Sequence, residues 1–170
     1  MKRLLVYILL IIGTFLIQTG VVPYFTLGGI APNLFIITTA SIGTLRGRKE
    51  GCLFGFFSGI LLESLYTTYF GIYALIFSTV GYFTGYIKKY FYEEDMTMPI
   101  LFIGLSDLFY GLVIYLTSFL ARGRINFFYY FRKIILPETI YSLIIAVFIY
   151  RLIIWINKQI ETKGSENRID

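Results

Sequence analysis

The chain has no histidine, one cysteine and one tryptophan among its 170 residues. Without histidine it lacks the usual general base near neutral pH and the most common metal ligand. The single cysteine, Cys52, cannot form a disulfide within the chain, and its place between a glycine and a leucine favours a small packing residue over a reactive thiol. These absences exclude histidine-based catalysis and disfavour a conventional metal centre.

The motifs of well-known enzyme classes are also missing. The sequence has no glycine loop that ends in Lys-Ser or Lys-Thr, no cluster of metal ligands and no nucleophile elbow. Carboxylates alone can perform acid–base chemistry, but nothing that flanks them here indicates a reaction. We therefore predict that the protein is not an enzyme and uses no cofactor.

The chain is instead rich in apolar and aromatic residues. It is 57% hydrophobic and 19% aromatic, and its mean hydropathy is +0.74. This composition is too apolar for an ordinary soluble domain. The net charge of +5 would suggest nucleic acid as the partner of a soluble protein, but in this chain it is better explained by orientation in a membrane. We expect no nucleic-acid partner.

Six apolar stretches come close to the ~20 residues that a bilayer span needs. They are residues 4–22, 30–45, 51–70, 72–87, 98–120 and 134–156. Backbone amides find no water in hydrocarbon, so these spans are expected to be helices. The predicted fold is an all-α integral membrane protein, a compact bundle of six transmembrane helices. Residues 1–156 would form its single domain, and residues 157–170 a polar cytoplasmic tail.

Residues 23–32, PYFTLGGIAP, form an uncharged segment that two prolines and two glycines interrupt. Broken segments of this kind often line sites in membrane proteins, and they are as often plain loops. The segment either dips into the bilayer surface or packs as an irregular cap.

Basic residues favour the cytoplasmic side of a membrane, and placing the N-terminus there puts most of them inside. The predicted cytoplasmic loop between the second and third spans carries Arg46, Arg48 and Lys49. With six spans the C-terminus is cytoplasmic as well. One loop, residues 121–133, disagrees because it is expected outside and yet is basic. Its basic residues are Arg122, Arg124, Arg132 and Lys133.

Three acidic residues, Glu63, Asp107 and Glu138, fall within predicted spans. A charge at the bilayer centre costs at least ~2.5 kcal/mol on insertion scales, so such residues normally face the protein interior. With the N-terminus inside, all three lie in the middle or outer half of the membrane. Either they face a polar cavity that opens outward beneath basic residues of the 121–133 loop, or they pair with nearby polar side chains and hold helices together. Glu138 follows Pro137, so it also suits the positive end of a helix dipole.

Small residues recur every four positions in the third span, at Gly51, Gly55 and Gly59, and the fourth span carries Gly81 and Gly85. Such spacing lets helix backbones approach closely in lipid. We expect the third span to pack tightly against the fourth. A homodimer interface is the alternative use of this stripe.

Short motifs along nearly the whole chain together resemble the rod shape-determining protein MreD family. They are Pro32-Asn33-Leu34, residues 46–51 (RGRKEG), residues 55–59 (GFFSG) followed by Leu61-Leu62-Glu63, residues 71–74 (GIYA), Gly81-Tyr82 with Gly85, and Leu136-Pro137-Glu138 with Tyr141. Two positions depart from the family pattern. Glu63 stands where aspartate is usual, and Phe70 stands where proline often precedes the glycine.

The resemblance implies a multi-pass protein of the bacterial cytoplasmic membrane that belongs to the elongation complex of rod-shaped cells. The implied partners are an MreC-like membrane protein, MreB, RodA and a class B penicillin-binding transpeptidase, together with membrane lipid. The implied function is a membrane scaffold or regulatory subunit that supports lateral peptidoglycan synthesis and rod shape. No catalysis is implied.

The family is also similar in architecture to the substrate-binding subunits of energy-coupling factor transporters, six-helix bundles with an outward pocket. This suggests an alternative function, a small-solute (vitamin-like) binding subunit. The sequence argues against it, because no outer loop is rich in the asparagine, glutamine or tryptophan that a polar vitamin needs. Trp155, at the inner end of the last span, is better explained as an interface anchor.

Overall fold

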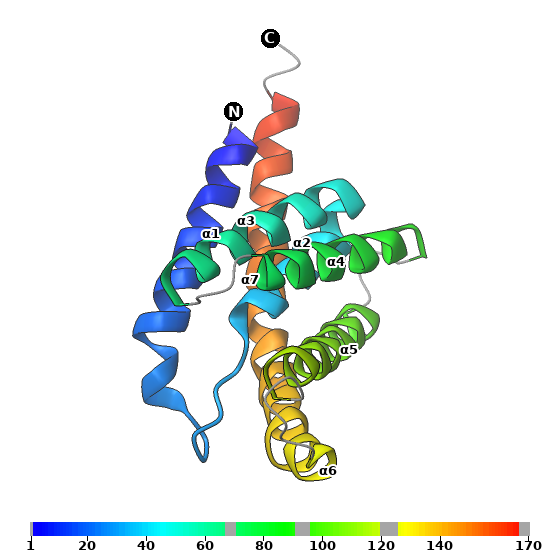
Figure 1. Ribbon diagram of the computed structural model, residues 1–170. Coiled ribbons are helices and arrows are strands. Elements are labelled where there is room, and N and C mark those ends of the chain that lie inside the picture. The colour runs from blue at the N-terminus through cyan, green and yellow to red at the C-terminus, as the bar shows by residue number, and fades with distance from the viewer. Residues whose placement is uncertain (1, 67–70, 91–95, 120–125, 167–170) are drawn as a thin grey trace.

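The computed structural model describes residues 2–66, 71–90, 96–119 and 126–166 (Figure 1). Within these residues six helices contain 13 residues or more. They are α1 (Lys2–Gly20), α2 (Leu34–Arg46), α3 (Arg48–Tyr66), α4 (Ile72–Ile87), α5 (Thr97–Ile114) and α7 (Leu136–Glu166). No strand is formed in the described part of the chain, so the predicted all-helical fold is confirmed.

Shorter helical segments connect or extend the long helices. They are the 3-10 helices η1 (Val22–Phe25) and η2 (Lys88–Tyr90), the π-helices η3 (Tyr115–Phe119) and η5 (Phe131–Ile135), and one turn of α-helix, α6 (Phe127–Tyr130). The segments α6, η5 and α7 follow one another without a break. The last helix therefore begins within the loop that the sequence predicted, and it continues to Glu166 through the predicted tail. No proline follows Pro137, so nothing forces the helix to end at residue 156.

Two of the described helices are long and apolar enough to cross a membrane. They run from Thr97 to Thr117 and from Phe127 to Gln159, with mean hydropathies of 1.9 and 2.1. Three further apolar helices are shorter, Leu4–Gly20, Leu34–Arg46 and Ile72–Ile87. The structure thus fits a membrane protein, and the number of spans stays a prediction.

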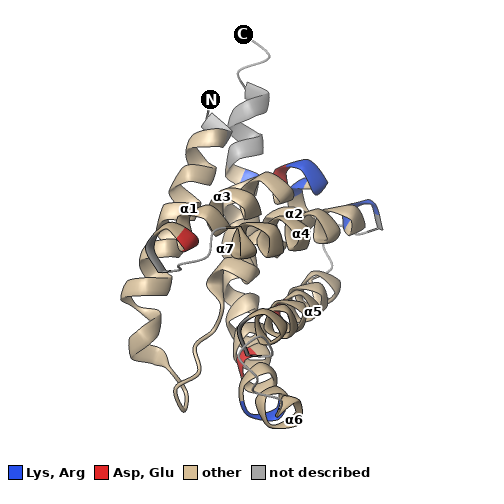
Figure 2. Cartoon of the chain, in the orientation of Figure 1, with Lys and Arg blue, Asp and Glu red and all other residues tan. Residues whose placement is uncertain are grey.

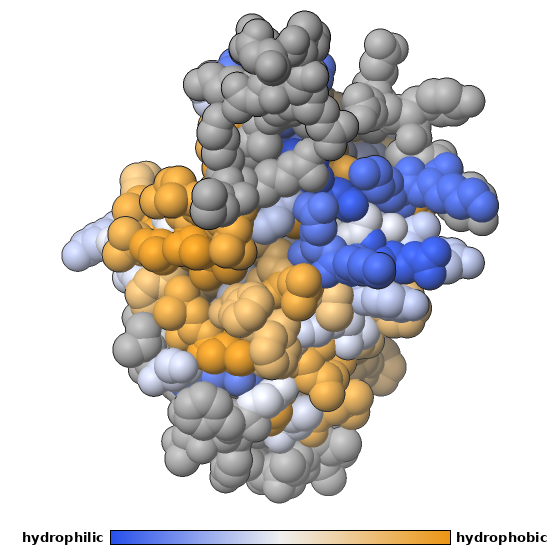
Figure 3. Space-filling view, turned by 90° about the horizontal axis from the view of Figure 1, so that it is seen from above, coloured by the Kyte–Doolittle hydropathy of each residue, from blue (hydrophilic) through white to orange (hydrophobic). Residues whose placement is uncertain are grey.

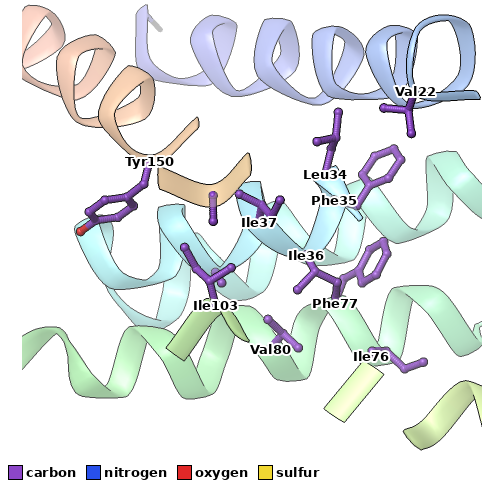
Figure 4. Packing of buried hydrophobic residues seen from close by; sticks show 12 residues of the cluster. Val22, Leu34, Phe35, Ile36, Ile37, Ile76, Phe77, Val80, Ile103 and Tyr150 are labelled. Atoms are coloured by element: carbon purple, nitrogen blue, oxygen red, sulfur yellow. The ribbon is translucent and has the colours of Figure 1, made fainter. Parts of the chain in front are cut away.

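The helix α2 forms the centre of the fold. Every residue from Leu34 to Thr44 is buried, and α2 contacts α3, α4, α5 and α7. Figure 4 shows its side chains among those of the surrounding helices, with Phe77 and Val80 on one side and Ile103 nearby. The Phe35 ring stacks on Phe77 with centroids 5.8 Å apart.

Three of the four hydroxyl side chains of α2 donate to carbonyls of the helix itself. The Thr38 hydroxyl donates to the Leu34 carbonyl at 2.9 Å, and the Ser41 hydroxyl donates to the Ile37 carbonyl at 2.6 Å. Asn33 caps the first turn, where its Oδ1 accepts from the Ile36 amide at 3.2 Å. A buried polar group costs free energy only when it is unpaired. This pairing lowers the cost of burying three of the hydroxyls, whereas the Thr39 hydroxyl has no partner at hydrogen-bond geometry among the described residues.

The glycine stripe brings α3 and α4 into direct backbone contact. A Cβ atom added at Gly51, Gly55, Gly59, Gly81 or Gly85 would lie closer than 3.0 Å to backbone atoms of the facing segment. At Gly51, for example, the nearest such atom is the Gly81 carbonyl oxygen at 2.5 Å. All five glycines are buried, so this packing occurs within one chain and leaves the stripe covered.

Replacing Gly55 with alanine should force α3 away from α4, because the new methyl would overlap the Phe77 carbonyl. Overpacking of this kind costs about 1–3 kcal/mol. The matched control is Gly13→Ala on α1, where nothing lies within 4 Å of an added Cβ; there alanine should be neutral or stabilising by up to ~1 kcal/mol. Unfolding of both variants in detergent, followed by circular dichroism, measures the difference. Equal stability of the two variants would contradict the backbone contact.

Candidate functional site

A polar cavity of about 670 Å³ lies between the end of α1, residues 28–33, α4, α5 and the start of the last helix. Its apolar wall includes Phe35, Leu62 and Ile134. Its polar lining comes from Gln18, Asn33, Tyr73, Tyr110, Tyr129, Lys133 and Glu138. The cavity is large enough for a small ligand or for a few side chains of a partner.

One wall of the cavity is a tight turn of the PYFTLGGIAP segment. Gly28 and Gly29 have φ values of 61° and 82°, which only glycine adopts at low cost. Across the turn, the Leu27 amide donates to the Ile30 carbonyl at 2.9 Å and the Ile30 amide donates to the Leu27 carbonyl at 3.1 Å. The segment is therefore an ordered cap in this structure.

Side-chain hydrogen bonds fasten this cap to the helices on both sides. The Gln18 amide donates to the Pro32 carbonyl at 3.1 Å, and its Oε1 accepts from the Leu34 amide at 2.8 Å. At the other end the Tyr141 hydroxyl donates to the Phe25 carbonyl at 2.7 Å. Because α1 and α7 both hold the segment, it forms a fixed wall of the cavity.

Glu63 does not line the cavity but caps α4. It is 1% exposed, and its Oε2 accepts from the Gly71 amide at 2.9 Å. Its Oε1 accepts from the Tyr73 amide at 2.5 Å and from the Ala74 amide at 3.4 Å. The first amides of a helix have no partners within it, and the positive end of the helix dipole favours an anion. This placement supports the hypothesis that Glu63 holds the helices together.

Asp107 lies between α5 and α7 and is 2% exposed. It faces the hydroxyls of Thr139 and Ser142 on α7. Among the described residues, however, neither of its carboxylate oxygens nor the Thr139 hydroxyl has a partner at hydrogen-bond geometry. A carboxylate in this state is a cost to folding that the protein must offset elsewhere. Such a cost is typical of residues kept for function.

Glu138 and Lys133 both line the cavity, from the first turn of α7 and from η5. Within the described residues neither side chain makes a hydrogen bond or an ion pair. Arg132 is exposed beside them, and the predicted roof residues Arg122 and Arg124 lie outside the described residues. The structure thus brings one predicted acid and one predicted basic residue to the same cavity.

Tyrosine rings meet Glu138 at the cavity. Tyr73, Tyr110 and Glu138 all line it, and Tyr110 follows Asp107 by about one turn of α5. The ring centroids of Tyr73 and Tyr110 are 6.2 Å apart, and those of Phe77 and Tyr110 are 6.1 Å apart. Asp107, one turn earlier on α5, does not belong to the cavity lining.

Sequence reasoning missed the tyrosines and Gln18. A signal for Tyr110 was present, because it follows Asp107 by three residues and so shares its helix face. Gln18 is the only amide side chain in the first predicted span. A single polar side chain in an apolar span indicates a specific partner, so this residue also could have been found from the sequence. The π-helix η5, which carries Lys133, had no sequence signal, although π segments are frequent at functional sites.

The predicted cytoplasmic basic loop lies away from the cavity. Arg46 ends α2, and Arg48 and Lys49 begin α3. Between them Gly47 has a φ of 100°, which lets the chain reverse. Figure 2 shows basic residues at the ends of α2 to α4 and, apart from these, beside α6.

The fold is all-helical in the described residues, and two of its helices are long and apolar enough to cross a membrane. The chain belongs to the family described as rod shape-determining protein MreD, which its sequence matches over residues 1–160. The resemblance found in the sequence is thereby confirmed, and the family is one of membrane proteins of the rod-shape system rather than a known enzyme family. Comparisons with curated proteins and with solved structures give no match.

The opposite surroundings of two buried acids predict opposite effects of neutral replacements. Glu63→Gln keeps one acceptor oxygen but weakens the bonds to three backbone amides, so it should destabilise the fold by about 1–3 kcal/mol. Denaturant unfolding in detergent measures this loss. Unchanged stability of Glu63→Gln would contradict the capping role.

Asp107→Asn should instead be neutral or stabilising, because it replaces a buried carboxylate, whose oxygens have no partner at hydrogen-bond geometry, with an uncharged side chain of nearly the same shape. The same unfolding experiment applies, with Glu63→Gln as the matched control. A loss of stability in Asp107→Asn equal to that of Glu63→Gln would show that the Asp107 carboxylate is paired after all.

Proposed function

We propose that the protein is a membrane scaffold of the bacterial rod elongation complex that binds an MreC-like partner and supports lateral peptidoglycan synthesis. Membership of the MreD family supports this proposal, because it links the chain to rod-shape determination. MreB, RodA and a class B penicillin-binding transpeptidase are the proposed further members of the complex. The protein's own contribution is binding and not chemistry.

The proposed topology has six spans and cytoplasmic termini. Both termini lie at one end of the molecule, whereas α6 and the loop before α2 lie at the other end (Figure 1). With the termini inside, the polar cavity opens on the outer side. The 13 residues of α2 span about 20 Å, less than the ~30 Å hydrocarbon core. Because α2 is buried among other helices, its ends need not reach the headgroups.

The polar cavity is the proposed docking site for the partner. Lys133 and Glu138 bring one positive and one negative group to it, and burial of such groups is favourable only when a partner pairs with them. Tyr129 lines the cavity and is 66% exposed, and Phe128 next to it is 85% exposed. Exposed aromatic rings around a polar cavity are typical anchors of an interface. A polar segment of the MreC-like partner, which reaches the cavity from the outer side, matches this arrangement.

A co-purification experiment tests the docking site. The protein is tagged at its C-terminus and extracted in mild detergent, and the MreC-like partner is quantified by mass spectrometry. Lys133→Ala and Glu138→Gln should each reduce the recovered partner at least fivefold, because each leaves a partner group unpaired on binding, at a cost of about 1–3 kcal/mol. The unfolding temperature of each variant shows that the fold is kept.

The matched control is Arg132→Ala, which removes a neighbouring basic residue that does not line the cavity. It should leave recovery of the partner unchanged. If Lys133→Ala and Arg132→Ala behave alike, the cavity is not where the partner binds.

The cavity volume favours one alternative, a small-solute binding subunit of an energy-coupling factor transporter. Ligand pockets usually measure about 300–1,000 Å³, and this cavity lies within that range. A ligand that binds only the folded state at 100 times its Kd stabilises the protein by about 2.7 kcal/mol. A thermal-shift series with candidate vitamins therefore tests the alternative, and a flat response across the series would count against it.

A further inference from the structure

An apolar groove of about 690 Å³ runs between α1 and α3, away from the polar cavity. The two helices cross rather than run alongside each other (Figure 1), and the groove lies between them. Leu4 and Ile8 of α1 and Leu53 and Phe57 of α3 line it, and all four are about half exposed. In a membrane such a groove is open to lipid.

The groove ends in a polar contact near the start of α3. The Tyr7 hydroxyl donates to Glu50 Oε2, and the Tyr7 ring packs edge-on against Phe54 with centroids 6.1 Å apart. At the far end the Ser64 hydroxyl donates to the Ile60 carbonyl at 2.8 Å, so it presents no free donor to the groove. From Glu50 to Ser64 the helix rises about 21 Å. One leaflet of the hydrocarbon core is about 15 Å thick, so the groove can hold the length of one acyl chain.

A second, basic hollow of about 580 Å³ adjoins the polar end of this groove. Arg46, Arg48, Lys49, Glu50 and Tyr82 line it, and Glu50 lines both spaces. The Arg48 guanidinium lies 4.4 Å from the centroid of the Tyr86 ring, which restrains it. The lining of the hollow thus contains three basic side chains and one acid, and that acid already accepts a hydrogen bond from Tyr7. Figure 3, viewed from the end with the termini, shows hydrophilic side chains on one side of this face and hydrophobic ones on the other.

We propose that the groove and the hollow together form a site for one anionic phospholipid. One acyl chain lies along the groove, and the phosphate of the headgroup lies in the basic hollow. Any lipid could fill the groove, but the hollow selects a negative headgroup, because each basic residue near a membrane surface strengthens anionic-lipid binding about fivefold. Arginine adds paired hydrogen bonds to phosphate oxygens.

The charge at the end of the groove favours an anionic lipid over an apolar partner helix. Basic side chains line the adjoining hollow and match a phosphate, whereas an apolar helix offers them no partner.

Native mass spectrometry of the full chain in detergent tests the site. The probes are phosphatidylglycerol and phosphatidylcholine with identical acyl chains, added at equal concentration. We expect one phosphatidylglycerol retained per chain, at least tenfold more than phosphatidylcholine. The double variant Arg48→Gln with Lys49→Gln should bring the ratio of retained phosphatidylglycerol to phosphatidylcholine close to one. The control Arg132→Gln with Arg151→Gln removes the same charge from two exposed positions elsewhere and should keep the ratio.

A second pair of variants tests the groove without changing charge. Leu53→Trp fills the groove and should reduce phosphatidylglycerol retention at least fivefold. Leu75→Trp adds the same ring on α4, where the side chain is 67% exposed and outside the groove, and should have no effect. Both positions are exposed, so neither variant should alter the unfolding temperature measured without lipid.

Equal retention of the two lipids by the unaltered protein would overturn the proposal. The proposal would also be overturned if the ratio of retained phosphatidylglycerol to phosphatidylcholine stayed the same in both the Arg48/Lys49 variant and the Leu53 variant. A photocrosslinker placed at Leu53 in intact membranes should capture phospholipid. Capture of a second copy or of another protein at that position would show that a helix occupies the groove instead.

Discussion

Within a hydrocarbon surrounding, a buried carboxylate must find its partners inside the protein or in a bound molecule. The three acids that fall within predicted spans meet that constraint in three ways. Glu63 takes its partners from backbone amides at the start of α4. Asp107 has none at hydrogen-bond geometry among the described residues, and Glu138 faces a cavity. Glu63 thus has a structural role, whereas the other two acids have no hydrogen-bond partner among the described residues.

The hydrogen bonds of Glu63 depend on the packing of α3 against α4. Direct backbone contact along the glycine stripe places the end of α3 beside the first turn of α4, where Glu63 reaches the free amides. The same contact leaves α2 enclosed on several sides. With α2 to α4 packed together, α1 crosses α3, which leaves the apolar groove between them. The polar cavity and the groove therefore follow from one compact arrangement.

Much of the fold could be predicted from local sequence. Apolar stretches gave helices, and the spacing of Gly51, Gly55 and Gly59 predicted a close contact between neighbouring spans, because small residues allow backbones to meet. Helix ends were less certain, and the last helix is longer at both ends than predicted. Its first turns replace part of the loop around Lys133, where an apolar and aromatic sequence has no residue that stops a helix until Pro137.

The candidate site depended on contacts that local sequence does not contain. The segment that forms a cavity wall is held at one end by Gln18, which bonds Pro32, and at the other by Tyr141, which bonds Phe25 from 116 residues away. The partners of Glu63 are backbone amides, which every residue except proline possesses and which no side-chain pattern reveals. Tyr110, by contrast, shares a helix face with Asp107, so that part of the site was within reach of sequence reasoning.

The central claim is that the polar cavity on the outer side receives the MreC-like partner. Photocrosslinking in growing cells tests it most directly, with the crosslinker placed at Tyr129 on the cavity or at Ile144, an exposed apolar position of α7 outside it. The account predicts a crosslink to the MreC-like protein from position 129 and none from position 144. A crosslink from position 144 alone would contradict it and place the partner on the lipid-facing side of the last helix.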